Sequence, residues 1–137
     1  MREIKFRGLT NDGKWIYGDL ITDGFKSKNS FANIFPISAN EYTFDLCVQV
    51  ELSTVGQYTG LKDKNGVDIY EGDIVYHERI GKGKVTWLSN RCGFFVVYYG
   101  IGTDVINRKP YQSAYKMNAL KYEVIGNIHQ NPELCKK

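Results

Sequence analysis

The sequence has few prolines and cysteines, and it contains no long apolar run. Proline occurs 3 times in 137 residues, and the 3 cysteines, Cys47, Cys92 and Cys135, never form a C-x-x-C pair. An odd number of widely spaced cysteines is typical of reduced thiols and not of a disulfide framework. No stretch approaches the roughly 20 apolar residues that a membrane-spanning helix requires, and the charged first residues do not resemble a signal peptide. We therefore expect a cytoplasmic protein without a membrane segment.

Aromatic side chains are abundant instead. The chain holds 10 Tyr, 7 Phe and 2 Trp, which together make up 14% of the residues, and it holds 14 Gly. Aromatic residues favour strands, and glycine favours tight turns. A chain of this length can bury one self-sufficient core. We expect a single, mainly β domain over residues 1–137.

Several stretches alternate apolar and polar residues, which is the pattern of half-buried strands. The clearest is 45–52, where every second residue from Leu46 is apolar. Short links at 81–83 and 90–93 predict hairpins in a barrel-like antiparallel meander of bent sheets. The expected strands are 3–9, 15–21, 31–37, 45–52, 73–80, 84–89, 94–100 and 122–128, with Gly126 a candidate bulge. One or two short helices are expected, over 112–120 and after Asn131, which would cap a turn that has Pro132 at its first position.

The segment 56–76, GQYTGLKDKNGVDIYEGDIVY, is rich in Gly, Asp, Asn and Lys. A calcium-binding EF-hand loop with Gly66 at its sixth position would need carboxylates where Leu61 and Gly72 stand, so that interpretation fails. Asn65-Gly66 instead favours a tight turn whose backbone Asp63 can bind. Residues 71–73 predict a second turn, at an exposed corner. We interpret the segment as two turns that shape the fold.

No motif in the sequence predicts catalysis. The stretch 81–86, GKGKVT, lacks the spacing of a phosphate loop and is better interpreted as a hairpin turn. The two histidines, His77 and His129, share no short spacing with a thiol, so neither predicts a metal site. We expect no catalytic residue, cofactor or metal, and a structural or surface role for each histidine.

The segment 56–75, GQYTGLKDKNGVDIYEGDIV, closely resembles the YopX-like family of small phage and prophage proteins. MREIKFRG at 1–8 and EVIGNIHQNPEL at 123–134 resemble the two ends of that family. The resemblance covers nearly the whole chain in order, and it leaves 22–45 and 100–120 as the variable middle. It implies bent and coiled antiparallel sheets and a phage or prophage setting. It implies no established reaction, cofactor or catalytic residue.

Charge is divided unevenly along the chain. Residues 1–78 hold 8 Lys/Arg against 12 Asp/Glu, whereas residues 79–122 hold 8 Lys/Arg against one Asp. Basic residues interleaved with aromatic ones suit single-stranded nucleic acid, because phosphates bind cations and bases stack on rings. The alternative is that these residues lie on exposed strand faces, or that the uneven charge serves internal pairing or subunit contact. The candidate nucleic-acid-binding residues are Lys82, Lys84, Arg91, Arg108 and Lys109.

Taken together, these patterns predict a non-catalytic protein-binding or assembly module that forms homo-oligomers through exposed aromatics and edge strands. A single-stranded nucleic-acid-binding β module that uses 79–122 is the first alternative. An unrecognised small enzyme is the second.

Overall fold

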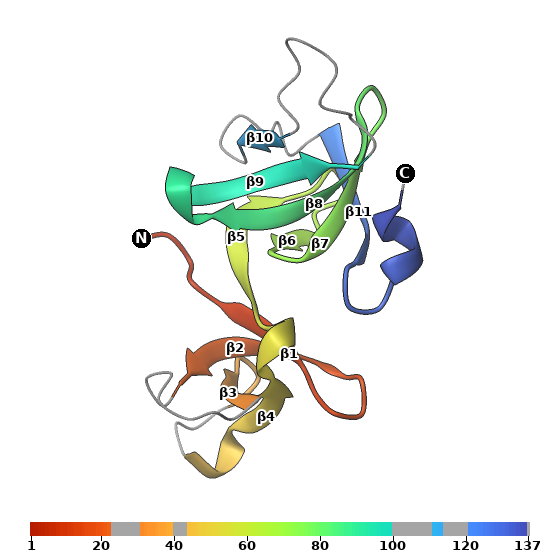
Figure 1. Ribbon diagram of the computed structural model, residues 1–137. Helices are drawn as coiled ribbons and strands as arrows, with labels where there is room; N and C mark the ends of the chain where they lie inside the picture. Colours follow the sequence, from red (N-terminus) through yellow and green to blue (C-terminus); the bar gives the residue numbers. More distant parts are fainter. Residues whose placement is uncertain (23–30, 40–43, 100–110, 114–120, 137) are drawn as a thin grey trace. The chain divides into compact units, whose positions relative to one another are not determined.

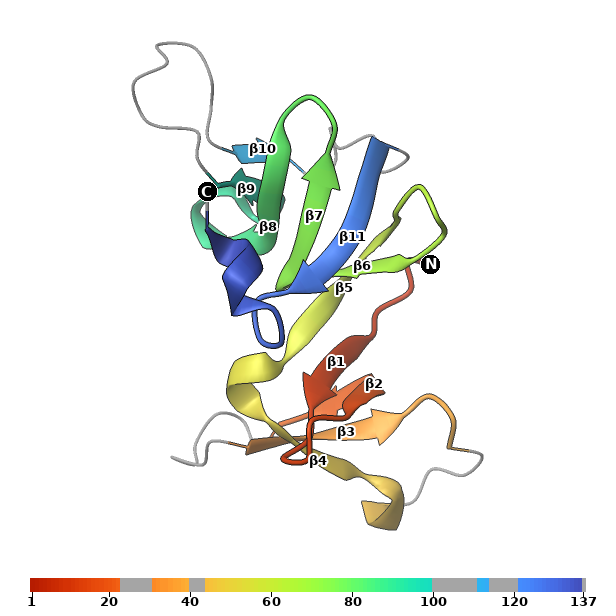
Figure 2. The same ribbon diagram turned by 90° about the vertical axis from the view of Figure 1, so that its right-hand side faces the viewer.

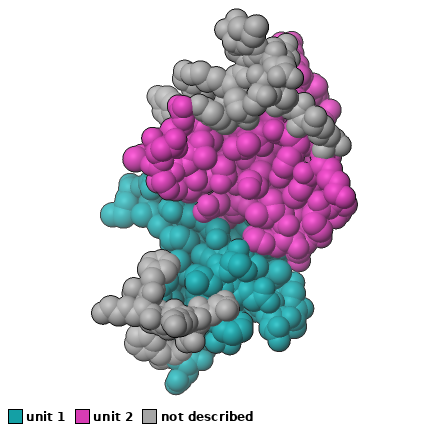
Figure 3. All heavy atoms as spheres, viewed as in Figure 1, with its two compact units in different colours: residues 1–58 teal, residues 59–137 magenta. Residues whose placement is uncertain are grey.

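The computed structural model describes residues 1–22, 31–39, 44–99, 111–113 and 121–136 (Figure 1). The chain divides into two compact units, residues 1–58 and 59–137 (Figure 3), and each is described by itself. The predicted mainly β fold with antiparallel sheets is confirmed, and the two sheets are open and not closed into a barrel. The expectation of one domain over the whole chain stays a prediction.

The first sheet has six strands in the order β4-β3-β2-β1-β5-β6. Their bounds are β1 Phe6–Leu9, β2 Trp15–Ile21, β3 Phe31–Pro36, β4 Val48–Glu51, β5 Gly56–Lys62 and β6 Asp68–Tyr70. Strand β5 begins in the first unit and ends in the second. The core of the first unit consists of Ala32, Ile34 and Val50, against which Ile16, Leu20, Leu52 and Val55 pack.

The strand predicted over 45–52 is wrong at both ends. Only β4 is a strand, because the short 3₁₀ helices η1 (Phe44–Leu46) and η2 (Leu52–Thr54) lie on either side of it. The Thr54 hydroxyl donates to the Glu51 carbonyl at 2.7 Å and accepts from the Leu9 amide at 2.8 Å. These bonds replace the ladder bonds that a continuing strand would make.

The second sheet has five strands in the order β10-β9-β8-β7-β11 (Figures 1 and 2). Their bounds are β7 Asp73–His77, β8 Gly81–Leu88, β9 Gly93–Tyr98, β10 Tyr111–Ser113 and β11 Tyr122–Asn127, with the 3₁₀ helices η3 Ser89–Arg91 and η6 Pro132–Cys135. The core of this unit consists of Ile69, Val75, Val85, Val96, Tyr98 and Tyr122.

The hairpin link predicted at 81–83 lies earlier in the chain. Residues 78–80 form the turn, and 81–83 already belong to β8, paired with the end of β7. Gly83 does not form a turn. It is needed for close packing between strands, because a Cβ atom at this position would lie 2.5 Å from Val96 Cγ1. Glycine in a strand interior often marks such a close approach.

Other local predictions have mixed outcomes. The predicted hairpin between β8 and β9 is present, but its link spans 89–92 and Gly93 already belongs to β9. The bulge at Gly126 is confirmed, because the β11–β7 register shifts between Val124 and Gly126. Residues 112–113 belong to β10 and not to a helix, and 114–120 lie outside the described residues. Pro132 does begin η6, but the Asn131 side chain does not cap it, because its Oδ1 accepts from the Asn127 amide at 3.2 Å.

The Asp63 carboxylate is buried and accepts hydrogen bonds from three backbone amides. Its residue is 2% exposed, and its Oδ1 accepts from the amides of Asn65 at 2.8 Å and Val67 at 2.9 Å. Its Oδ2 accepts from the Val124 amide at 2.9 Å, on β11. The predicted binding of the turn backbone is therefore confirmed, and the same side chain also binds an edge strand 61 residues away.

The second turn of the segment is not the exposed corner that its sequence predicts. Asp73 is 1% exposed, and its Oδ2 accepts from the Tyr70 amide at 2.8 Å. The Gly72 amide donates to the Val85 carbonyl at 2.9 Å, and the Gly72 carbonyl accepts from the Ile128 amide at 2.9 Å. The turn is buried because backbone groups of two other segments bind it.

We expect Asp63→Ala to lower the free energy of unfolding by about 3 kcal/mol or more, because three amides lose a charged acceptor and two of them serve the turn itself. The matched control is Asp68→Ala, which removes the partly exposed carboxylate bound to Lys62 and should cost less than about 1 kcal/mol. Urea denaturation of both variants measures the difference. Equal losses for the two variants would contradict this role of Asp63.

The stability supplied by Asp63 should depend on pH. Burial raises the pKa of Asp63, but the amides of Val124, Val67 and Asn65, together with the Lys64 charge, outweigh burial and hold that pKa below its ordinary value of 3.8. A depressed folded-state pKa stabilises the fold above the unfolded-state pKa, and this contribution is lost as pH falls through the folded-state pKa. Urea midpoints measured from about pH 6 to about pH 2 should therefore fall less steeply for Asp63→Asn than for the native chain. Parallel curves would refute the assignment.

Candidate functional site

The structure brings together two of the five predicted basic residues. Lys82 and Lys84 stand two positions apart on β8, so they share a face, and the buried Gly83 and Val85 face the opposite way. Arg91 is exposed in η3, beyond the other end of β8. Arg108 and Lys109 lie outside the described residues.

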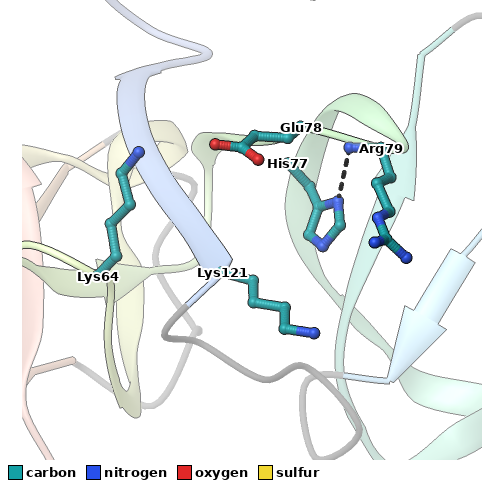
Figure 4. Close-up of a pocket in the computed structure, with 5 residues that line it drawn as sticks. All are labelled: Lys64, His77, Glu78, Arg79 and Lys121. Atoms are coloured by element: carbon teal, nitrogen blue, oxygen red, sulfur yellow. Dashed lines mark hydrogen bonds between the residues drawn. The ribbon is translucent and has the colours of Figure 1, made fainter.

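A polar pocket of about 300 Å³ lies beside the β7–β8 turn (Figure 4). The β5–β6 turn contributes Lys64 to it, and the end of β7 with the following turn contributes His77, Glu78 and Arg79. Lys121, which stands directly before β11, also lines it. The pocket therefore combines three cationic side chains, one imidazole and one carboxylate, all within the second unit.

The imidazole of His77 is held on two sides. The Arg79 backbone amide donates to His77 Nδ1 at 3.1 Å, and the Tyr122 ring lies 4.9 Å from the His77 ring, tilted by 54°. In a neutral imidazole one nitrogen accepts and the other carries the proton. The bond at Nδ1 therefore assigns the proton of the neutral ring to Nε2.

The two sides of the pocket differ in charge. Figure 4 shows the Glu78 carboxylate turned toward the side of Lys64 and away from Arg79. Lys64 is also paired with Glu123 at 2.8 Å, and this bond, aided by the charge of Glu78, raises the pKa of Lys64. Among the described residues, no carboxylate lies within ion-pair distance of Arg79 or Lys121. The His77–Arg79–Lys121 side is therefore the more strongly cationic one.

A second exposed feature lies at the opposite end of β8. Trp87 is 44% exposed, and its ring meets the Phe94 ring edge-on, with centroids 5.0 Å apart and planes at 75°. Arg91 is exposed on the adjoining η3, and Cys92 ends that turn in the left-handed conformation, with φ 48°. The β8–β9 hairpin end thus presents an exposed indole that packs against Phe94, and the exposed Arg91 lies on the adjoining η3.

The described ranges also hold cysteines and other potential metal ligands. The three cysteines, Cys47, Cys92 and Cys135, are free. Within the part of the chain that the structure describes, no three His, Cys, Asp or Glu residues gather as metal ligands would. Nor is any described helix both long enough and apolar enough to cross a membrane.

Sequence reasoning missed the pocket. Arg79 and Lys121 fall inside the basic segment 79–122, but His77 was expected to be structural or a surface residue, and Lys64 was part of a turn. Lys121 comes near His77 because β11 pairs with β7, where Tyr122 lies opposite His77. The bond from Val124 to Asp63 joins the turn of Lys64 to β11. No local sequence pattern predicts a contact between residues that are 61 positions apart.

Comparison with known proteins identifies the family. The sequence matches the family model described as YopX protein over residues 5–136. The chain belongs to the YopX family. This match confirms the resemblance of the three sequence blocks to the family. No curated protein matches the sequence.

Among solved structures, this YopX chain is similar to the crystal structure of protein EF1440 from Enterococcus faecalis. The two share 24% sequence identity and a TM-score of 0.60, over 99% of this chain and 100% of the other. At this identity the likeness shows a shared fold and carries no activity from one protein to the other.

Proposed function

We propose that this YopX chain is a non-catalytic protein-binding or assembly module that associates with a second copy of itself through the β8–β9 hairpin end. The observation that carries the proposal is Trp87, half-exposed yet fixed edge-on against Phe94. Trp and Arg are the residue types most enriched among those that dominate binding energy, and Arg91 adjoins. A side chain fixed before binding loses less conformational entropy when it binds.

Two acidic residues of the segment 56–75, which resembles the YopX family, support a non-catalytic role. The carboxylates of Asp63 and Asp73 accept bonds from backbone amides, so both are engaged in shaping turns. The three free thiols favour a reducing compartment, and we propose the bacterial cytoplasm. The family resemblance favours a phage or prophage setting.

Sedimentation velocity from about 1 μM to about 100 μM tests the assembly role, because weak complexes dissociate over this range. The mean mass should rise with concentration and respond little to salt. Trp87→Ala should weaken association about 30-fold, which corresponds to about 2 kcal/mol. Tyr17→Ala, which truncates an exposed aromatic of the first unit, is the matched control and should associate like the native chain. A native chain that stays monomeric throughout would overturn the proposal.

Single-stranded nucleic-acid binding is the second candidate function. The observation that favours it is that Lys82 lies near the β7–β8 turn, at the same end of the sheet as the cationic pocket. Cations at one end of a sheet can follow a phosphate backbone. Arg91 lies at the other end and does not belong to this surface.

Fluorescence anisotropy with labelled single-stranded DNA and RNA tests this candidate. Affinity should fall about tenfold or more between about 50 and about 200 mM salt, and Lys82→Glu with Lys84→Glu should flatten that dependence. The charge-matched control, Arg2→Glu with Lys14→Glu, changes exposed cations of the first unit and should retain the native slope. Absence of binding at the lower salt concentration would exclude this function.

A further inference from the structure

We propose that the pocket beside the β7–β8 turn binds a phosphate group through Arg79, Lys121 and the Nε2–H of His77. The inference names a ligand chemistry for the second candidate function, and it does not depend on self-association. The phosphate could belong to a polynucleotide backbone or to a small phosphate monoester. Both sources present the same non-bridging oxygens to the pocket.

The donors suit phosphate better than a carboxylate. A guanidinium group can donate two parallel bonds to one phosphate, and an ammonium group adds a compact charge. The His77 imidazole supplies a further N–H, because its Nδ1 is already occupied by the Arg79 amide. Phosphate oxygens are arranged tetrahedrally and can meet three donors from different directions, whereas the two oxygens of a carboxylate lie in one plane.

The imidazole donor is held in place before a ligand arrives. Tyr122 supports the His77 ring and is itself buried, with its hydroxyl bonded to the Tyr98 hydroxyl. Lys121 is the neighbour of Tyr122 in the chain, so the position of its backbone follows from the same packing. The Glu78 carboxylate, which would compete with an anion, is turned toward Lys64.

The dimensions and polarity of the pocket further limit which ligands it can hold. A volume of about 300 Å³ lies at the lower end of small-molecule sites, which usually run to about 1,000 Å³ and are mainly apolar. The residues that line it in the described part of the chain are all charged or polar. A pocket of this size and charge suits a phosphate with its attached sugar better than a large apolar ligand.

The experiment uses the full chain and three probes: inorganic phosphate, a nucleoside monophosphate, and a short single-stranded DNA without terminal phosphates. Phosphorus NMR follows the first two, and anisotropy follows the third. At least one probe should bind more tightly than about 1 mM. Arg79→Gln with Lys121→Gln should weaken each observed binding at least tenfold. Arg79→Lys should weaken it less, because it keeps the charge and loses only the paired donors.

The variants leave the architecture intact, because Arg79 and Lys121 are exposed and the bond to His77 comes from the Arg79 backbone. Each single variant is measured beside the double one, and Arg2→Gln with Lys14→Gln controls for net charge. Binding of all probes more weakly than about 1 mM overturns the inference, as does native affinity in the double variant. DNA binding that is insensitive to the pocket variants overturns the inference but leaves nucleic-acid binding standing. Binding of the monophosphate without DNA supports the inference and excludes nucleic-acid binding.

Discussion

The second unit depends on one buried carboxylate. Asp63 binds two amides of its own turn and the Val124 amide of β11, the edge strand of the sheet. Burying a charged group is costly unless several donors compensate, and three backbone amides do so here. The Lys64 amide adds a bond to the Tyr122 carbonyl at 3.0 Å. The outer side of β11 is thereby partly occupied, which limits the pairing of that edge with another chain.

The same contact contributes to the pocket. It joins the β5–β6 turn, which carries Lys64, to β11, and the pairing of β11 with β7 brings Lys121 near the turn that carries Arg79. The other exposed feature, Trp87, lies at the far end of β8. This sheet thus has two chemically different ends, a cationic one at the β7–β8 turn and an aromatic one at the β8–β9 link.

Sequence patterns predicted the elements better than their junctions. Alternation and Asn65-Gly66 correctly indicated β strands and a tight turn, because these depend on neighbouring residues. Local pattern failed where distant groups bind the backbone, as at the buried Asp73 and at Gly83, which allows β9 to approach. It failed for the pocket for the same reason. Charge along the chain located Arg79 and Lys121 within a basic segment, but it could not reveal that His77 joins them.

Backbone-amide NMR of the full chain would distinguish a scaffolding role of Asp63 from a ligand-binding role. A titration with nucleoside monophosphate and a series of protein concentrations would be recorded on the same sample. The account predicts that the titration shifts residues 77–79 and 121–122, that the concentration series shifts 87–94, and that the Val124 amide bonded to Asp63 moves in neither. Shifts centred on Val124 and the 63–67 turn in either series would contradict this role of Asp63. The turn that contains Asp63 would then be a binding site and not the scaffold of one.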